Sequence, residues 1–428
     1  MDTSKKYAVI GAGPAGLSGA RNLQRFNIDF DGYEKHSDVG GLWDIENPHS
    51  TVYETAHLIS SKKMTEFTEF PMDESVADYP SHHELRKYFR DFAREYKLYD
   101  HYRFNSAVAN ISPGNNGWQL ALENGDTLPY AGVIIANGTL SEPNIPFSAS
   151  DFSGEIMHSA KYKSPKIFAG KRVLIIGAGN SGCDIAVDAI HFAKKVSISV
   201  RRGYHFVPKY VFGRPADTMG GLIRLPARFK QAIDSRLLKL FTGDPVKLGF
   251  PEPDHKMYES HPIVNTLILY HLGHGDIDVK ADLARFDGHT VHFKNGASEE
   301  YDLVVMATGY KLHYPFIEKK HLNWNGKAPQ LYLNAFHPEY DNLFILGMVE
   351  AAGIGWQGRY ELAELIARFI VGAREGSKGA VKFKKLKSKP PPDMKGGFNY
   401  MDVERMAYYV HKDTFLKLLR KNIELLKK

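Results

Sequence analysis

Two stretches of the chain repeat one pattern, and this repetition constrains the fold more than any other feature. Residues 7–34 contain the apolar run YAVI, the turn Gly11-Ala-Gly13-Pro-Ala-Gly16, a helix-compatible segment and a second strand. Residues 172–201 repeat this order around the turn Gly177-Ala-Gly179-Asn-Ser-Gly182. A strand that runs through such a turn into a helix is the fingerprint of dinucleotide binding. We therefore expect an α/β protein with two Rossmann-like, dinucleotide-binding domains.

The first unit carries an acidic partner, which favours a nucleotide with free ribose hydroxyls. The first glycine of the turn permits a tight bend, the second lets the backbone approach a pyrophosphate, and the third lets the helix pack on the strand. Glu34 ends the second strand, where a carboxylate accepts hydrogen bonds from ribose. A structural turn with a surface glutamate is the alternative, and we favour it less. The predicted FAD contacts here are Gly11, Ala12, Gly13, Pro14, Ala15, Gly16, Glu34 and Lys35.

The second unit carries a basic partner instead. Its second strand ends at Arg201-Arg202, with no acidic residue at the ribose position. Paired guanidinium groups suit a 2′-phosphate and favour NADPH over NADH, although a solvated pair at a strand end is the alternative. The predicted NADP contacts are Gly177, Gly179, Asn180, Ser181, Gly182, Arg201 and Arg202, of which Asn180 could equally cap the helix. Two different partners imply two nucleotides, with NADPH passing a hydride to a tightly held flavin.

The rest of the chain predicts additions to these two units. With 428 residues the chain exceeds one ordinary core, so we expect two domains that interleave in sequence. An amphipathic helix at 82–97 precedes strands that read as antiparallel, with Asn124-Gly125 as a hairpin turn. Residues 203–275, with helical segments near 222–241 and 262–272, predict a cover over the nicotinamide and the substrate. A long helix spans 356–374, a Lys- and Pro-rich linker 382–395, and a basic amphipathic helix ends the chain. We expect this last helix to dock on the protein or a partner rather than on a membrane.

Composition excludes several classes of function. The single cysteine, Cys183, rules out a disulfide framework and an intrachain redox pair, so any redox chemistry requires a bound cofactor. The net charge of +6 sits largely in the linker, without interleaved aromatics, so we expect no nucleic-acid partner. The histidines show no metal-ligand spacing, and we expect no metal site. No apolar run approaches a membrane span, and the start of the chain leaves no room for a signal peptide, so we expect a cytoplasmic protein.

A stretch between the two units carries a family resemblance. In FSGEIMHSAKYK, residues 152–163, the residues Phe152, Gly154, His158 and Tyr162 fit neither a helical nor a strand period. The stretch matches the pattern F-x-G-x-x-x-H-x-x-x-Y-K of the class B flavin-containing monooxygenases. The segments GGLW (40–43) and ATGY (307–310) also match this family, and the resemblance extends to about residue 375. It implies flavin contacts at Gly41, Leu42, Trp43, Ser60 and Gln357, and NADP contacts at Thr308 and Gly309; for Gln357 a cap-and-core role is equally favoured.

With the resemblance, the expected organisation is an NADPH domain inserted in an FAD domain. The FAD domain would comprise residues 1–164 and 321–380, and the NADPH domain residues 165–320 with its cover at 203–275. Residues 381–428 would hold the basic linker and the C-terminal helix.

The resemblance also implies a reaction. NADPH reduces FAD, the reduced flavin reacts with O2 to a C4a-hydroperoxide, and a nitrogen or sulfur of a small amine or sulfide takes one oxygen atom. Baeyer–Villiger relatives carry Trp at the Tyr162 position, so Tyr162 favours nitrogen and sulfur oxidation. The alternatives are Baeyer–Villiger oxygenation of ketones, an NADPH oxidase that releases H2O2, and a non-catalytic NADP(H)-sensing flavoprotein. A homodimer is compatible with this expectation.

One departure from the family pattern concerns the flavin environment. The segment YETAHLISSKKM aligns with the family pattern Y-x-S-x-x-x-N-S-x-K-E-M, so that Ile59 replaces the asparagine near flavin C4a while Ser60 matches. Isoleucine cannot donate a hydrogen bond, and we predict either faster peroxide leakage or another donor. No catalytic residue is certain: His158 invites assignment as a general base with Tyr162 as its partner, but we favour structural or gating roles for both.

Overall fold

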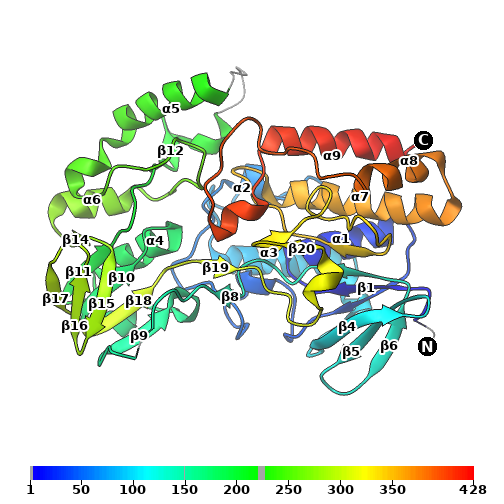
Figure 1. The fold of residues 1–428 in the computed structure, drawn as a ribbon, viewed down its shortest axis with the longest axis horizontal. Helices are drawn as coiled ribbons and strands as arrows, with labels where there is room; N and C mark the ends of the chain where they lie inside the picture. Colours follow the sequence, from blue (N-terminus) through cyan, green and yellow to red (C-terminus); the bar gives the residue numbers. More distant parts are fainter. Residues whose placement is uncertain (1–2, 149, 220–226) are drawn as a thin grey trace.

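Two parallel β-sheets form the centre of the molecule and confirm the α/β class. The computed structural model describes residues 3–148, 150–219 and 227–428. The first sheet has the order β22-β7-β1-β2-β3 and the second the order β14-β11-β10-β18-β9, and every pairing within them is parallel. Figure 1 shows the second sheet at one end of the molecule and the first sheet under the long helices at the other end.

The first sheet combines strands from distant parts of the chain. Its strands are β1 (Tyr7–Ile10), β2 (Phe30–Tyr33), β3 (Tyr102–Arg103), β7 (Gly132–Ile135) and β22 (Leu343–Ile345). Strands β1, β2, β7 and β22 are buried along their whole length, as expected where helices cover both faces of a parallel sheet. Helix α1 (Pro14–Arg25) follows the first glycine turn, with Gly13 as N-cap and a proline at its start.

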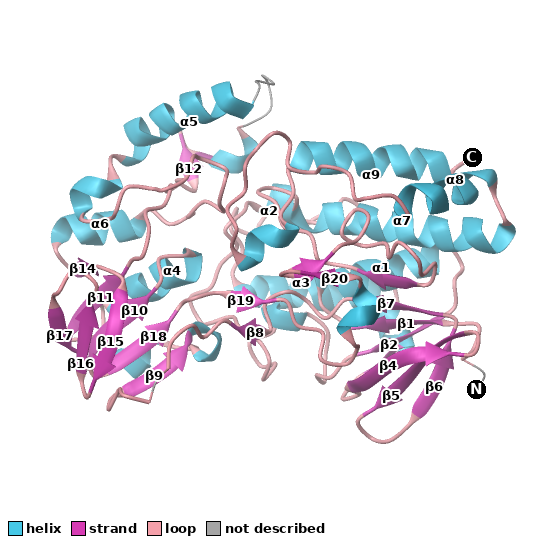
Figure 2. Cartoon of the chain, viewed as in Figure 1, coloured by secondary structure: helices cyan, strands magenta, loops and turns pink. Residues whose placement is uncertain are grey.

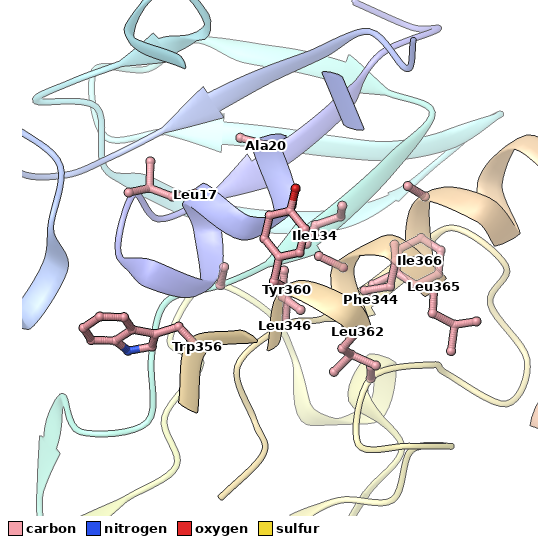
Figure 3. Close-up of a cluster of buried hydrophobic side chains, with 14 of the residues drawn as sticks. Leu17, Ala20, Ile134, Phe344, Leu346, Trp356, Tyr360, Leu362, Leu365 and Ile366 are labelled. Carbon is pink, nitrogen blue, oxygen red and sulfur yellow. The ribbon is translucent and has the colours of Figure 1, made fainter. Parts of the chain in front are cut away.

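Helix α7 (Gly355–Glu375) closes the first sheet against α1. Figure 3 shows Leu17 and Ala20 of α1, Ile134 of β7 and Phe344 of β22 packed in one buried cluster with the apolar side of α7. This cluster joins the start of the chain to its last third. The fold of the first unit therefore depends on residues that precede the second sheet in the sequence and on residues that follow it.

The second sheet uses one continuous stretch of sequence. Its strands are β9 (Glu155–His158), β10 (Arg172–Ile176), β11 (Lys195–Ser199), β14 (Ile277–Lys280) and β18 (Leu303–Met306), and α4 (Asn180–Ala189) follows the second glycine turn. Residues 152–163, in which the spacing of Phe152, Gly154, His158 and Tyr162 fits no strand period, nevertheless contain a strand, because β9 pairs with β18 as an edge strand of this sheet. Three residues of β9 are only partly buried or exposed, which explains why its sequence lacks an apolar pattern.

The two chain crossings between the sheets pair with each other. Strand β8 (Glu142–Pro143) leaves the first sheet, and β19 (Tyr310–Lys311) returns to it, and they form a two-stranded antiparallel ribbon. Smaller sheets complete the fold: β12 (Tyr210–Val211) with β13 (Arg214–Pro215), β15 (Leu283–Asp287) with β16 (Thr290–Phe293) and β17 (Ser298–Glu300), and β20 (Trp324–Asn325) with β21 (Ala328–Pro329).

The antiparallel region is smaller than expected. Strands β4 (Val108–Gly114), β5 (Gly117–Leu122) and β6 (Thr127–Tyr130) form it, and the predicted hairpin turn is confirmed with Gly125 at φ +94°. The neighbouring segments that we also expected to be antiparallel form β3 and β7 of the parallel sheet. The reason is burial: β7 is covered on both faces, whereas β5 alternates between buried and half-buried residues.

Helices cover the two sheets. The predicted helix at 82–97 is α3 (His82–Glu95), whose start at Ser81 forms a capping box with Glu84. In the predicted cover lie α5 (Ala227–Thr242) and α6 (Leu267–His274); residues 222–226 of the expected helix lie outside the described residues. The short α2 (Lys62–Thr65) precedes α3. Within residues 3–148, 150–219 and 227–428, no helix is both long and apolar enough to cross a bilayer.

The end of the chain forms two further helices. The prediction of a linker at 382–395 was wrong for its first residues, because α8 (Lys378–Lys387) extends into this segment as far as Lys387. The side chain of Lys387 is buried and donates from Nζ to the carbonyl oxygens of His337, Pro338 and Tyr340, so this lysine is not solvated. Helix α9 (Lys412–Leu426) packs along α7 and α8, which confirms docking on the protein (Figure 2).

Candidate functional site

The first glycine turn is built so that side chains cannot occupy it. Gly11 has φ +105°, and a Cβ there would lie 2.6 Å from the Ala136 carbonyl oxygen. A Cβ on Gly16 would lie 1.8 Å from the Gly11 carbonyl oxygen, so only glycine lets α1 start this close to β1. Pro14 and Ala15 form the first turn of α1. The turn therefore brings the N-terminus of α1 close to the end of β1, an arrangement that generally suits phosphate groups.

Glu34 is fixed beside this turn by backbone donors. The Ala12 N–H donates to one carboxylate oxygen at 2.7 Å, and the His36 N–H donates to the other at 2.9 Å. Glu34 is only 6% exposed, so its carboxylate is largely shielded from solvent. Lys35 follows with an exposed side chain. This geometry leaves lone pairs of Glu34 available for hydroxyl groups next to the turn.

The GGLW segment packs directly on the first turn. A Cβ on Gly41 would lie 3.0 Å from the Gly13 Cα, and the Gly40 N–H donates to the Ala12 carbonyl oxygen. Gly41, Leu42 and Trp43 form a single 3₁₀ turn, η1 (Gly41–Trp43). The Trp43 ring meets the Trp356 ring edge to face at 6.4 Å, which brings η1 to the start of α7. The segment therefore lies between the first turn and the last long helix.

The predicted flavin contacts at 59, 60 and 357 meet at the start of α7. A Cβ on Gly355 would lie 2.2 Å from the Met64 carbonyl oxygen, so α2 packs on the start of α7. The Gln357 side chain accepts a hydrogen bond from the Thr68 N–H at 2.9 Å. The Ser60 hydroxyl lies 2.7 Å from the Thr65 hydroxyl, and Ile59 is half-buried beside it. The structure thus brings these three predicted residues into the neighbourhood of one helix end.

The second glycine turn repeats the close approach of the first. Gly177 has φ +101° and a Cβ there would lie 2.6 Å from the Ala307 carbonyl oxygen, while a Cβ on Gly182 would lie 2.0 Å from the Gly177 carbonyl oxygen. A Cβ on Gly179 would meet nothing within 4 Å, so open space lies in front of the second glycine. Such space next to a helix N-terminus suits a pyrophosphate.

The polar residues of the second turn have separate partners. Asn180 is the first residue of α4 rather than its cap, and its side chain donates to the Pro262 carbonyl oxygen and accepts from the Val264 N–H. Ser181 follows it in the first turn of α4. Arg201 is exposed at the end of the second strand. Arg202 is 22% exposed, with Nη1 3.8 Å from Asp254 and 3.5 Å from the sulfur of Met401.

His158 links its own segment to the ATGY segment through the two nitrogens of its ring. Its Nδ1 accepts the Ala160 N–H at 3.1 Å, so Nε2 carries the ring hydrogen and donates to the Gly309 carbonyl oxygen at 3.1 Å. Burial lowers the pKa of His158, which keeps the ring neutral in this arrangement. The Tyr310 ring packs on it edge to face. Thr308 is held by the neighbouring segment, since its hydroxyl donates to the Asn144 carbonyl oxygen.

Tyr162 ties residues 152–163, which we call the family connector, to α4. The ring is fully buried and stacks on Phe168, and its hydroxyl donates to Asp188 at 2.8 Å. The Thr55 hydroxyl donates to the same oxygen of Asp188 at 2.5 Å. Burial raises the pKa of Asp188 although both hydroxyls oppose this. Lys163 donates to the carbonyl oxygens of Ser50 and Val52, so the connector also holds the segment before α2.

Sequence reasoning missed several residues where the family connector and the segment before α2 contact the second unit. Asp184 lies one turn before Asp188 on α4 and accepts hydrogen bonds from Tyr53 and Asn265; burial raises its pKa. The sequence did contain a signal for these contacts, namely two aspartates four residues apart on the helix after the second glycine turn. Such a helix packs against its sheet, so carboxylates on it need hydrogen-bond partners. Asp217 in the cover accepts the Ser61 N–H at 2.7 Å, and no sequence pattern indicates this contact.

Comparison with known sequences decides the family. The sequence model of the family described as "Flavin-binding monooxygenase-like" matches residues 4–387. The chain belongs to this family.

Relatives and solved structures agree with this assignment. Flavin-containing monooxygenase 5 of Oryctolagus cuniculus is 29% identical over 409 residues, which cover 87% of this chain and 74% of that protein. Dimethylaniline monooxygenase [N-oxide-forming] 2 of Pan troglodytes is 29% identical over 401 residues, with the same two shares. The structure of a flavin-containing monooxygenase from Stenotrophomonas maltophilia is similar with a TM-score of 0.67 at 22% identity, covering 87% of this chain and all of that one. At this identity the structural likeness concerns the fold alone.

Membership of the flavin-binding monooxygenase-like family confirms the predicted enzyme class and cofactors. The protein is an oxidoreductase that acts as a monooxygenase, with FAD and NADPH as cofactors. The family match ends at residue 387, so the segment that follows α8 lies outside it. Within the described parts of the chain, no group of three or more His, Cys, Asp or Glu side chains is arranged to hold a metal ion.

Proposed function

We propose that the protein uses NADPH and O2 to oxygenate a nitrogen or sulfur atom of a small molecule. In this proposal the two sheets belong to two dinucleotide-binding domains: residues 1–164 and 321–380 bind FAD, and residues 165–320 bind NADPH. Strand β9 (Glu155–His158) is the exception, because it precedes residue 165 but pairs within the second sheet. The observation that carries it is the position of the two glycine turns. Each has its own partner residues, and the family connector binds the second turn's helix through Tyr162 and the ATGY segment through His158.

The residues at the first turn fit FAD. Gly11 and Gly16 have no room for a Cβ, so strand, turn and helix pack closely and the N-terminus of α1 would face a pyrophosphate. Glu34, oriented by the Ala12 and His36 N–H groups, would accept hydrogen bonds from ribose hydroxyls. The proposal assigns the flavin side of the site to Gly41, Leu42, Trp43, Ser60 and Gln357.

The residues at the second turn fit NADPH. Open space in front of Gly179 would admit the pyrophosphate, and Arg201 and Arg202 would bind a 2′-phosphate. Arg202 has only a distant ionic partner in Asp254, at 3.8 Å, so its guanidinium has donors left for a phosphate. Thr308 and Gly309 lie at the end of β18, where His158 fixes their backbone.

Bound FAD would supply the chemistry, namely uptake of a hydride from NADPH and activation of O2, and the chain's own side chains would have supporting tasks. Buried aromatic residues at the start of α7 exclude water from the flavin side, since Trp356 packs against Trp43 and Phe67. His158 orients the Gly309 carbonyl group and Tyr162 holds α4, and both act as positioning residues. Neither has a free proton-transfer site here, because both ring nitrogens of His158 and the hydroxyl of Tyr162 already have partners.

Nitrogen or sulfur oxidation is favoured over ketone oxidation by Tyr162, which stands where Baeyer–Villiger relatives carry Trp. The test is NADPH consumption by the purified FAD-containing enzyme with panels of amines, sulfides and cyclic ketones, with oxygenated products identified and H2O2 counted. We expect N-oxides or S-oxides. Lactones or esters as the main products would overturn the proposal in favour of Baeyer–Villiger oxygenation. NADPH consumption at background level with every substrate would support a non-catalytic NADP(H)-sensing protein.

An NADPH oxidase activity is a second candidate, and the surroundings of Ile59 favour it. Ile59 offers no hydrogen-bond donor, and the neighbouring Ser60 hydroxyl already pairs with the Thr65 hydroxyl, so Ser60 is not a ready substitute for the asparagine of the family pattern. The Ser61 N–H donates to Asp217, and the Ser61 hydroxyl is buried without a hydrogen-bond partner among the described residues. An H2O2 yield close to one per NADPH with good thioether substrates would establish this activity. A homodimer and a cytoplasmic location stay predictions, which size-exclusion chromatography with light scattering and cell fractionation would test.

A further inference from the structure

The segment after α8 crosses from one sheet to the other. We call residues 388–411 the C-terminal strap; they lie outside the family match. Figure 1 shows this segment (red) running from the C-terminal helices to the middle of the molecule. On the side of the second sheet, the Met401 N–H donates to the Glu259 carbonyl oxygen, and the Tyr409 hydroxyl lies 3.1 Å from His261 Nδ1. On the side of the first sheet, the Val410 N–H donates to the Glu350 carbonyl oxygen.

The strap carries a guanidinium group into this junction. Arg405 belongs to the 3₁₀ turn η8 (Glu404–Tyr408), which packs on β19 between the two sheets. Its Nη2 donates to Glu350 Oε2 at 2.9 Å. Glu350 is 16% exposed and Arg405 is 38% exposed, so the pair lies at a surface that ligands can reach rather than in a closed core.

The junction has more positive than negative charge. Arg359 also approaches Glu350, at 3.5 Å, but its guanidinium is used by the Gly355 and Val349 carbonyl oxygens at 2.8 and 2.7 Å. Burial lowers the pKa of His261 to about 3, so this ring is neutral at ordinary pH. Two guanidinium groups therefore face one carboxylate, and one positive charge is left without a counter-ion among these groups.

Two polar side-chain atoms at the junction also lack partners. Within the part of the chain that the structure describes, Arg405 Nε and His261 Nε2 are buried and have no hydrogen-bond partner. Arginine offers five N–H donors in a planar fork, and the contact with Glu350 uses one of them. The remaining donors of the Arg405 guanidinium are therefore available to an anionic group that reaches the junction.

Arg405, Glu350 and His261 lie near both glycine turns. Glu350 follows β22 at the carboxyl edge of the first sheet, three residues after Gly347, whose Cβ would lie 3.0 Å from the Ala15 Cβ. His261 precedes Pro262, whose carbonyl oxygen accepts the Asn180 side chain of the second turn. Ligands of open α/β sheets bind outside the carboxyl ends of the strands. Arg405 thus lies between the two places where the nucleotides are proposed to bind.

We propose that Arg405 determines substrate specificity by binding a carboxylate group of the substrate, with Glu350 holding the guanidinium in place. A carboxylate matches the free side of the arginine fork and supplies the missing negative charge. This inference rests on the proposed oxygenation of a nitrogen or sulfur atom and names the substrate class as amino or thioether acids. A phosphate of the bound NADPH is the competing ligand for the same donors.

The test compares matched ligands on the enzyme loaded with FAD and NADP+. The probes are ω-(methylthio)alkanoates of increasing chain length and their primary amides, which differ only in the charged group. Isothermal titration calorimetry measures their binding without requiring turnover. We expect the best-fitting acid to bind about 10- to 100-fold more tightly than its amide, the range for charge-assisted hydrogen bonds. In Arg405→Gln this preference disappears while the amide binds as before.

Two further variants make the test specific. Arg420→Gln makes the same substitution on α9, where Arg420 is 62% exposed and pairs with Glu361, and it should leave the acid preference unchanged. Arg405→Lys keeps the charge but loses the fork, so an intermediate preference is expected. It also replaces Arg405→Gln as the test if the latter fails to retain FAD.

Three results would overturn the inference. These are equal binding of acid and amide to the unchanged enzyme, a full acid preference in Arg405→Gln, and weaker NADP+ binding in Arg405→Gln with the acid preference intact. The last result would assign Arg405 to the cofactor. Failure of the proposed function is a separate observation: the acid binds through Arg405, but no thioether or amine is oxygenated when NADPH and O2 are supplied.

Discussion

Replacing Tyr162 with phenylalanine distinguishes a positioning role from proton transfer in the family connector. The substitution removes one hydroxyl, which donates to Asp188 at 2.8 Å, and keeps the fully buried ring on Phe168. A hydrogen bond to a charged group contributes about 2 kcal/mol to the free energy of unfolding. For a unit of this size the loss corresponds to a melting temperature lower by roughly 4–8 °C. Differential scanning calorimetry of the FAD-loaded protein measures it.

The stability cost should depend on pH in one direction. Burial raises the pKa of Asp188, and the Tyr162 and Thr55 hydroxyls lower it. Removing Tyr162 as a donor raises the folded-state pKa of Asp188 further, whereas the unfolded-state pKa is unchanged. The cost of Tyr162→Phe is therefore largest where Asp188 is ionised, and it shrinks as pH falls through the raised pKa. We expect a larger loss at about pH 8 than at about pH 5.

A matched variant isolates the carboxylate. Tyr332→Phe also deletes a buried hydroxyl, but its partner is the neutral side chain of Asn422. Its cost should be smaller and independent of pH over the same range, since a neutral pair contributes about 1 kcal/mol.

The kinetic outcome decides the role of Tyr162. A general acid or base contributes about 10²- to 10⁴-fold to kcat, whereas a positioning residue leaves kcat within a few-fold once the protein is folded. We expect thioether oxygenation by Tyr162→Phe at close to the original kcat, measured well below its melting temperature. A kcat lower by about 100-fold with an unchanged melting temperature would refute the reasoning.

Three further substitutions test the remaining assignments. In Glu34→Gln the amide NH2 must face one of the two N–H donors that Glu34 accepts from. We therefore expect FAD to bind about 10- to 100-fold more weakly, measured by flavin release on ultrafiltration. Unchanged retention would contradict the assignment. Arg202→Gln should lower the ratio of kcat/KM for NADPH to that for NADH by about 10- to 100-fold, and an equal loss with NADH would show that Arg202 does not read the 2′-phosphate. Ile59→Asn should lower H2O2 released per NADPH by about tenfold, because it restores a donor; an unchanged yield would mean that another donor already acts there.

The sequence predicted those parts of the molecule that depend on neighbouring residues. Both glycine turns were located correctly because the close approach within each turn, such as Gly16 on Gly11, involves residues five apart. The hairpin turn at Gly125 and the capped helix α3 depend on equally local signals. Burial of β7 on both faces is a property of the whole sheet, and for this reason the strand was assigned to the wrong sheet from its own sequence.

The junction between the sheets was predicted least well, because its contacts join residues that are far apart in the chain. Tyr162 was expected in a connector, but its partner on α4 was not identified, and the partner of Asp188 at Thr55 lies more than a hundred residues away. The contact of Arg405 with Glu350 joins the strap to the end of β22. Such pairs leave no periodic pattern in either segment, whereas their chemistry is clear once the fold places them together.

The contacts of this junction also bear on how the two proposed nucleotide sites act together. The β8–β19 ribbon, the His158 contact with Gly309 and the Tyr162 contact with Asp188 are among the contacts that link the crossing segments and the second unit. Each hydrogen bond contributes only about 1–3 kcal/mol, far less than the buried core of either unit. Loss of one link therefore changes the relative orientation of the units before it unfolds either of them. Hydride transfer requires both nucleotides at one place, so it should be more sensitive to these links than the binding of either cofactor alone.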